Sequence, residues 1–266
     1  MKYPLFLFIL CLIPLFPACH HASSEPPVLI RQHYVLTGPN HCDTTTNKGV
    51  DVTVNYFLLK EDSRGAHTIN DSLRRLAVGS ITGWLDSTTL APHLNAQSNL
   101  ATAATLFAAD YETMISDMGG MGGCWELKMQ ADTLYTSAKA LTVRMETYAY
   151  TGGAHPNSNR ALYMFDRETG HTLSMTDLVS DTTALLDVVE RAFRRQQEIR
   201  PHTNLEEHGY FLRDGRFFLP ANIGLSRAGM VFCYNPYEIA AYAVGPIEVT
   251  VPYAQLSGIL RSDGPL

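Results

Sequence analysis

The chain has 266 residues, 17% of them charged, and a formal net charge of -6 at pH 7. This mildly acidic composition, without a cluster of basic residues, argues against nucleic acid as a partner. The length is sufficient for one large domain or two modest domains with apolar cores. Residues 1–18 contain one charged side chain, that of Lys2, so their removal changes the formal charge from -6 to -7.

The N-terminus has the residue pattern of an export signal. Lys2 is followed by the apolar run from Leu5 to Leu15, which is too short for a comfortable membrane span and contains Pro14. We therefore predict a secretory signal peptide at residues 1–18.

Cys19 directly follows the small residue Ala18, and this order resembles the lipobox of bacterial lipoproteins. The resemblance implies that Cys19 starts the mature chain and carries acyl chains, such as palmitate, that anchor it to a membrane. Residues 19–27 would then be a short polar tether. The expected localisation is the bacterial cell envelope, at the outer membrane or the periplasmic face. The alternative is an ordinary cleaved signal in which Cys19 is incidental.

Three cysteines remain for the folded part, so one disulfide at most can form. Cys42 and Cys124 both border glycine-rich and polar segments and are the favoured pair, whereas Cys233 lies in an apolar run where a free thiol packs as a small hydrophobe. No Cys-x-x-Cys motif is present, so we expect no structural metal, and no motif indicates a cofactor.

The first half of the chain alternates between strand and helix patterns. Residues 28–37 and 50–60 alternate apolar with polar side chains and predict two strands. Apolar residues at helical spacing predict helices over residues 69–84 and 100–118, the second ending at Gly119 and Gly120.

The second half begins with two long strand patterns at residues 124–135 and 140–150, which predict a hairpin. A further strand is expected at residues 161–166. Asp181 is suited to cap a helix that Pro201 ends, and short strands follow. Because strands and helices come in blocks, we predict an α+β fold with antiparallel sheets and packed helices. Two closely packed subdomains are expected, at residues 28–150 and 151–266.

Two separated motifs resemble a known family. "YTGGAHPN" begins at Tyr150, and "YNPYEI" begins at Tyr234 and is followed by a Tyr-Ala-x-Gly-Pro segment and an Ile-x-Val strand. This order is similar to the extracellular module of RsiV-type anti-sigma factors, which also accompanies PdaC-type peptidoglycan deacetylases. In those proteins the module is non-catalytic, and in the anti-sigma factor it binds lysozyme.

The motif residues have definable physical roles. Gly152 and Gly153 can adopt positive φ and allow a tight turn. Glu238 lies in apolar surroundings and needs a partner, and His155 is the natural choice because both segments belong to the family pattern. Such a pair would either lock two loops of the core together or serve as an acid/base site.

We therefore expect a lipid-anchored ectodomain that binds a cell-wall component or a wall-directed protein such as lysozyme. The alternatives are an enzyme that acts on peptidoglycan, as a hydrolase or deacetylase, and a structural envelope protein. No nucleophile or metal set is apparent, so no catalytic residue is assigned. The candidate ligand-binding residues are Tyr150, Gly152, Gly153, His155, Asn157, Tyr234, Tyr237 and Glu238.

Overall fold

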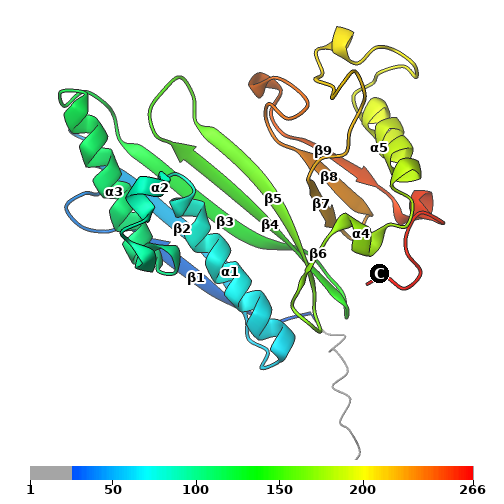
Figure 1. The fold of residues 1–266 in the computed structure, drawn as a ribbon, viewed down its shortest axis with the longest axis horizontal. Helices are drawn as coiled ribbons and strands as arrows, with labels where there is room; N and C mark the ends of the chain where they lie inside the picture. The colour runs from blue at the N-terminus through cyan, green and yellow to red at the C-terminus, as the bar shows by residue number, and fades with distance from the viewer. Residues whose placement is uncertain (1–25, 266) are drawn as a thin grey trace, which may run out of the picture.

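The computed structural model describes residues 26–265. The predicted signal peptide, Cys19 and most of the predicted tether lie outside the described residues. The described chain folds into a six-stranded sheet and a three-stranded sheet with helices packed on them, so the α+β prediction is confirmed (Figure 1). None of the described helices is both long enough and apolar enough to span a membrane.

The large sheet has its strands in sequential order. They are β1 (Leu29–Val35), β2 (Val50–Leu59), β3 (Trp125–Thr136), β4 (Ala140–Tyr150), β5 (Asn157–Asp166) and β6 (Thr172–Leu173). The predicted β3–β4 hairpin is confirmed, with Glu126 opposite Tyr150. Every pair is antiparallel except β2 with β3, because the helical segment between these two strands returns the chain to the end of the sheet where β2 began.

Three of the described helices cover one face of the large sheet (Figure 1). They are α1 (Arg64–Thr82), α2 (Ser87–Leu90) and α3 (Leu100–Asp117), with the 3-10 turn η1 (Leu94–Gln97) between the last two. Side-chain caps start them, since Ser63 accepts from the Ala66 amide and Asn99 accepts from the Thr102 amide. Their apolar sides and the facing strand residues form the first core, which includes Ile69, Phe107 and Leu127.

The C-terminal part is a smaller layer. It contains α4 (Met175–Leu178), α5 (Thr182–Gln196) and strands β7 (Asn222–Leu225), β8 (Met230–Tyr234) and β9 (Ile247–Val251) in sequential order. The 3-10 turns are η2 (Glu206–His208), η3 (Tyr242–Val244) and η4 (Tyr253–Leu256). Asp181 caps α5 as predicted, but the helix ends before Pro201 because Glu198 adopts a positive φ of 56°.

Strands β4 and β5 serve both layers. One face of this pair gives Leu141, Val143 and Phe165 to the first core, beneath the helices. The opposite face gives Ala140 and Met164 to the second core, which the C-terminal layer completes. Thr142, on the same face, accepts a hydrogen bond from the Leu225 amide at 3.2 Å and so links β4 to β7.

The predicted boundary between residues 150 and 151 is therefore misplaced. It would separate β4 from β5, which pair continuously from Ala140 opposite Asp166 to Ala149 opposite Asn157. Strand β5 also begins at Asn157, ahead of the expected Ala161, because this pairing extends to the turn. The two cores are separate, but they share a hairpin and are not two consecutive pieces of chain.

A disulfide joins Cys42 to Cys124, with 5.7 Å between their Cα atoms, and Cys233 is free and buried. The bond ties the loop before β2 to the start of β3. The two cysteines are 82 residues apart in sequence, so the bond closes a long loop. In the unfolded chain such a link removes conformational entropy.

Replacing Cys42 and Cys124 together by serine should lower the free energy of unfolding by about 3–4 kcal/mol. Urea unfolding followed by circular dichroism measures this loss. A reductant should destabilise the unaltered protein by a similar amount and leave the double variant unchanged. Equal sensitivity of both proteins to the reductant would contradict the prediction.

Candidate functional site

The turn between β4 and β5 carries the first predicted motif. Gly152 and Gly153 have φ values of 91° and 96°, so the expected positive φ is confirmed at both. The hydroxyl of Tyr150 donates to the Gly153 carbonyl at 3.2 Å and braces the turn. Asn157 is exposed at the first position of β5. This turn and the loop after β8 project from the same end of the molecule (Figure 1).

The second motif forms a turn directly after β8. The amide of Asn235 donates to the carboxylate of Glu238 at 3.0 Å, and the Tyr237 amide donates to the Ala240 carbonyl. Tyr237 has a φ of 68°, which is a strained conformation for a bulky residue. The residue is 58% exposed, so it combines a strained backbone with an aromatic ring that solvent can reach.

His155, Tyr237 and Tyr242 form an aromatic cluster, which we call the platform. The His155 ring stacks on Tyr242 with centroids 3.9 Å apart, and the two tyrosine rings lie 5.7 Å apart. The Tyr242 hydroxyl donates to the Pro156 carbonyl at 2.8 Å. These contacts join the β4–β5 turn to the C-terminal layer.

Both ring nitrogens of His155 have partners. Nδ1 lies 2.9 Å from the Pro156 carbonyl, and because a carbonyl only accepts, Nδ1 is the donor. In the neutral ring Nε2 then accepts from the Tyr237 hydroxyl, 3.2 Å away. The imidazole thus holds the Tyr237 ring in place while its own plane packs on Tyr242.

The predicted pair of His155 and Glu238 does not form. His155 is bound to Pro156 and Tyr237, while the Glu238 carboxylate turns back to the Asn235 amide of its own turn. A carboxylate so close in sequence to a free amide finds a local partner at lower entropic cost than a distant imidazole. The predicted pairing of His155 with Glu238, on which the enzyme alternative depended, is therefore wrong.

Tyr234 also differs from its predicted role. Its side chain is fully buried in the second core, and its hydroxyl donates to the Phe218 carbonyl at 2.7 Å. This burial raises the pKa of Tyr234 far above its ordinary value. A ligand cannot reach it. Of the eight candidates, His155 and Tyr237 are brought together in the platform, and Tyr150, Gly152, Gly153 and Glu238 shape the two turns.

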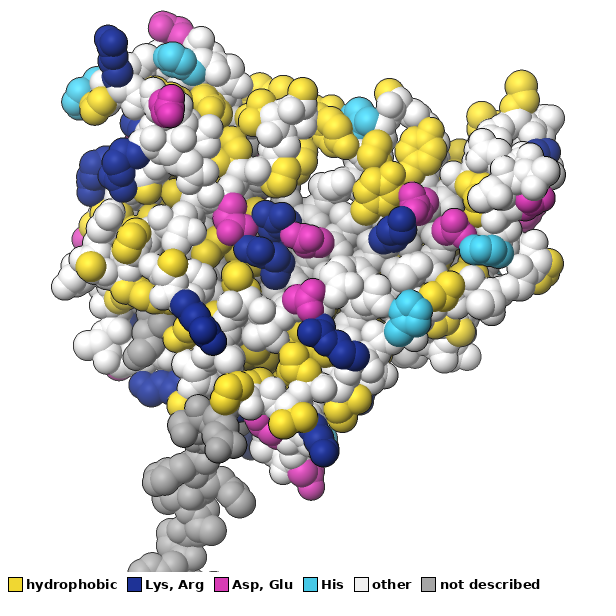
Figure 2. All heavy atoms as spheres, turned by 180° about the vertical axis from the view of Figure 1, so that it is seen from behind, with side chains coloured by type: hydrophobic (Ala, Val, Ile, Leu, Met, Phe, Trp, Pro, Cys, Tyr) yellow, Lys and Arg dark blue, Asp and Glu magenta, His cyan; other side chains and the backbone are white. Residues whose placement is uncertain are grey.

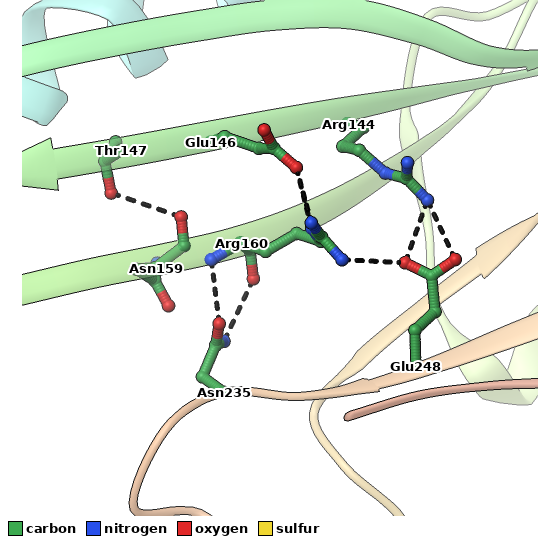
Figure 3. Close-up of polar contacts among 7 residues, drawn as sticks. All are labelled: Arg144, Glu146, Thr147, Asn159, Arg160, Asn235 and Glu248. Atoms are coloured by element: carbon green, nitrogen blue, oxygen red, sulfur yellow. Dashed lines mark hydrogen bonds and ion pairs between the residues drawn. The ribbon is translucent and has the colours of Figure 1, made fainter. Parts of the chain in front are cut away.

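Asn235 fastens the platform to the large sheet. Its side-chain oxygen accepts from the Arg160 amide at 2.7 Å, and its side-chain nitrogen donates to the Arg160 carbonyl at 2.9 Å (Figure 3). The side chain thus pairs with β5 as a neighbouring strand would. This contact explains why the turn after β8 sits against β5.

A network of four charged side chains adjoins this contact (Figure 3). Glu248 of β9 binds Arg144 through both carboxylate oxygens, at 2.9 and 2.8 Å, and also binds Arg160 at 3.1 Å. Arg160 binds Glu146 at 2.8 Å. The network joins β4 and β5 to β9, at the border where the C-terminal layer stops covering the sheet.

Beyond that border the sheet face is open, and sequence reasoning missed the cleft that lies there. It has a volume of about 480 Å³, and Asn235 and Pro246 stand at its edge. Figure 2 shows the molecule from behind, where side chains of both charge signs gather across the middle of the surface. The sequence signal for this cleft was the polar side chain at every second position of β2, β3 and β4. In each strand considered alone, this alternation indicates only a face exposed to solvent, so it did not reveal a cleft.

The strain at Tyr237 gives a test by substitution. Replacing Tyr237 with glycine should give a higher free energy of unfolding than replacing it with alanine, by about 0.5–1 kcal/mol. Glycine tolerates positive φ, and this outweighs its larger loss of chain entropy. Urea unfolding of the two variants measures the difference. At the extended position Tyr148 the order should reverse, with alanine the more stable, and the same order at both positions would refute the assigned strain.

The second motif falls within a known family model, and the first does not. Residues 176–254 match the model of a family described as a protein of unknown function (DUF3298). This range includes Tyr237 and Tyr242 but not His155. No curated protein matches the chain.

Two solved structures share the fold. A member of the DUF3298 family from Bacteroides fragilis has a TM-score of 0.67 and 20% identity, over 89% of this chain and 95% of that one. A DUF3298 family protein from Pseudomonas aeruginosa has a TM-score of 0.59 and 18% identity, over 90% of this chain and 96% of that one. Residues 176–254 are thus similar to the DUF3298 family, and the chain has the fold of two structures from that family.

Proposed function

We propose that this chain is a non-catalytic binding module of the cell envelope. Its partner would be a wall-directed protein such as lysozyme, or a cell-wall component. The observation that carries the proposal is the strained, exposed Tyr237, which His155 and Tyr242 hold in a fixed orientation. The resemblance of the two motifs to the RsiV-type and PdaC-associated modules supports the same reading.

The platform has the properties of a protein-docking site. Tyr237 and the nearby Val244 are 58% and 55% exposed, so apolar surface projects from this end of the molecule. Tyrosine is enriched among residues that dominate binding energy, since a rigid amphipathic ring loses little entropy when it docks. Here the hydrogen bond from Tyr237 to His155 orders the ring before any partner arrives.

The hydrolase alternative receives less support from this geometry. It required His155 as acid/base and Glu238 as its orienting carboxylate, and these two side chains have other partners. A purely structural role accounts for the contacts of His155, but it leaves unexplained why a strained backbone presents an aromatic ring to solvent.

Replacing Tyr237 with alanine should weaken binding to immobilised lysozyme by roughly 30-fold, corresponding to about 2 kcal/mol for a dominant interface residue. Surface plasmon resonance on the purified full chain measures this. Met121, which is 70% exposed in the loop between α3 and β3, supplies a matched apolar control, and its replacement by alanine should leave the affinity unchanged.

Substituting His155 with alanine should give a smaller loss than substituting Tyr237, because the Tyr237 ring remains but is no longer oriented. Lysozyme binding that survives both substitutions would exclude the platform as the docking site. Absence of binding by the unaltered chain would exclude lysozyme as the partner.

The proposed anchor has a separate test. We expect Cys19→Ser to release the protein from the membrane fraction of an expressing bacterium and to remove acyl mass from the intact chain, because the sulfur is the acylation point. Cys11→Ser, in the same leader, should change neither result. Membrane association that persists in the Cys19 variant would rule out anchorage at this residue.

A further inference from the structure

We propose that the open cleft on the large sheet is a second binding site, separate from the platform, and that it takes an uncharged glycan. The cleft lies on the face opposite α1 and α3, beside the C-terminal layer. Its volume of about 480 Å³ falls in the range of about 300–1,000 Å³ typical of small-molecule sites.

The floor of the cleft is formed by two rows of side chains that cross four strands. Residues directly opposite each other on neighbouring strands point to the same face, so each row is continuous. The first row is Thr53, Lys128, Tyr148 and Ser158, and the second is Asn55, Gln130, Glu146 and Arg160. A row spans three strand spacings, or about 14 Å, which suits an extended ligand lying across the strands.

Each of three cations in and beside the floor is bound by a carboxylate. Arg160 is bound by Glu146 and Glu248, and Arg144 is bound by Glu248. Lys128 is bound by Glu126, and this hydrogen bond raises the pKa of Lys128. Three cations therefore face three carboxylates. Each of these cations already lies against a carboxylate, so a phosphate or carboxylate ligand would approach negative charge as well as positive charge, and the cleft favours a neutral ligand.

The first row instead offers unengaged hydroxyl groups. Within residues 26–265, the hydroxyls of Thr53, Tyr148 and Ser158 form no hydrogen bond with the protein. Each can both donate and accept, as the hydroxyls of a sugar do. The half-buried Tyr148 ring adds an apolar surface for the C–H groups of a sugar ring. Polar groups in two rows and one aromatic face together match a polyhydroxylated ring better than a peptide or a lipid.

Calorimetric titration of the purified full chain with neutral trisaccharides tests the site. N-acetylated chitotriose represents wall amino sugars, cellotriose represents glycans without acetamido groups, and trigalacturonate is the anionic counterpart. We expect one or both neutral trisaccharides to bind, with an affinity that salt does not change, and trigalacturonate to bind at least tenfold more weakly. Binding of chitotriose alone would identify wall amino sugars as the source.

Two neighbouring positions on β5 give a matched pair of variants. Ser158 is exposed on the cleft floor, and Asn157 is exposed on the opposite face of the strand. Ser158→Trp should fill the cleft and abolish binding, whereas Asn157→Trp should leave the affinity unchanged. Tyr148→Phe, which keeps the ring and loses one hydroxyl, should weaken binding by up to about tenfold. Circular dichroism checks that each variant is folded.

The two proposed sites can fail independently. Tyr237→Ala should leave glycan binding intact, and Ser158→Trp should leave lysozyme binding intact. The cleft proposal is overturned if neither neutral trisaccharide binds, if trigalacturonate binds more tightly than both, or if Ser158→Trp and Asn157→Trp have the same effect. Loss of glycan binding in Tyr237→Ala would indicate that the glycan binds at the platform, and this result would also overturn the cleft proposal.

Discussion

The structure depends on the β4–β5 hairpin, both of whose faces are committed to a core. Leu141 and Val143 pack under the helices, while Ala140 and Met164 pack under the C-terminal layer. A shift of register by one residue would exchange these faces and expose both sets, so the pairing is strongly specified. Because one hairpin completes two cores, neither half of the chain contains all of its own packing partners.

The position of the cleft follows from where the C-terminal layer ends on this hairpin. Along one face, the side chains change from apolar at Met164, to charged at Arg144 and Arg160, to hydroxyl groups at Tyr148 and Ser158. The charges lie at the border because there they are partly shielded from water yet within reach of Glu248 from the covering layer. This half-buried border makes each ion pair stronger than a fully exposed one and fixes where β9 meets the sheet.

Local patterns predicted the elements and the Cys42–Cys124 pair, but they did not predict the partners of β5 and of His155. Strand alternation located β2, β3 and β4, and Asp181 correctly marked the start of α5. The sequence could not show that β5 belongs with β4 across the glycine turn, nor that His155 would face Tyr237 in preference to Glu238. Tyr234 and Tyr237 look equivalent in sequence, but the strand ends between them, so one is in the core and the other in solvent.

The platform and the cleft meet at Asn235. Its side chain pairs with the backbone of Arg160 on β5 at the edge of the cleft, while its amide is held by Glu238 in the turn that places Tyr237 at positive φ. The strain at Tyr237 can persist because the turn is anchored at both ends, to the sheet through Asn235 and to the β4–β5 turn through His155. The same two anchors fix the C-terminal loop against the sheet and against the β4–β5 turn.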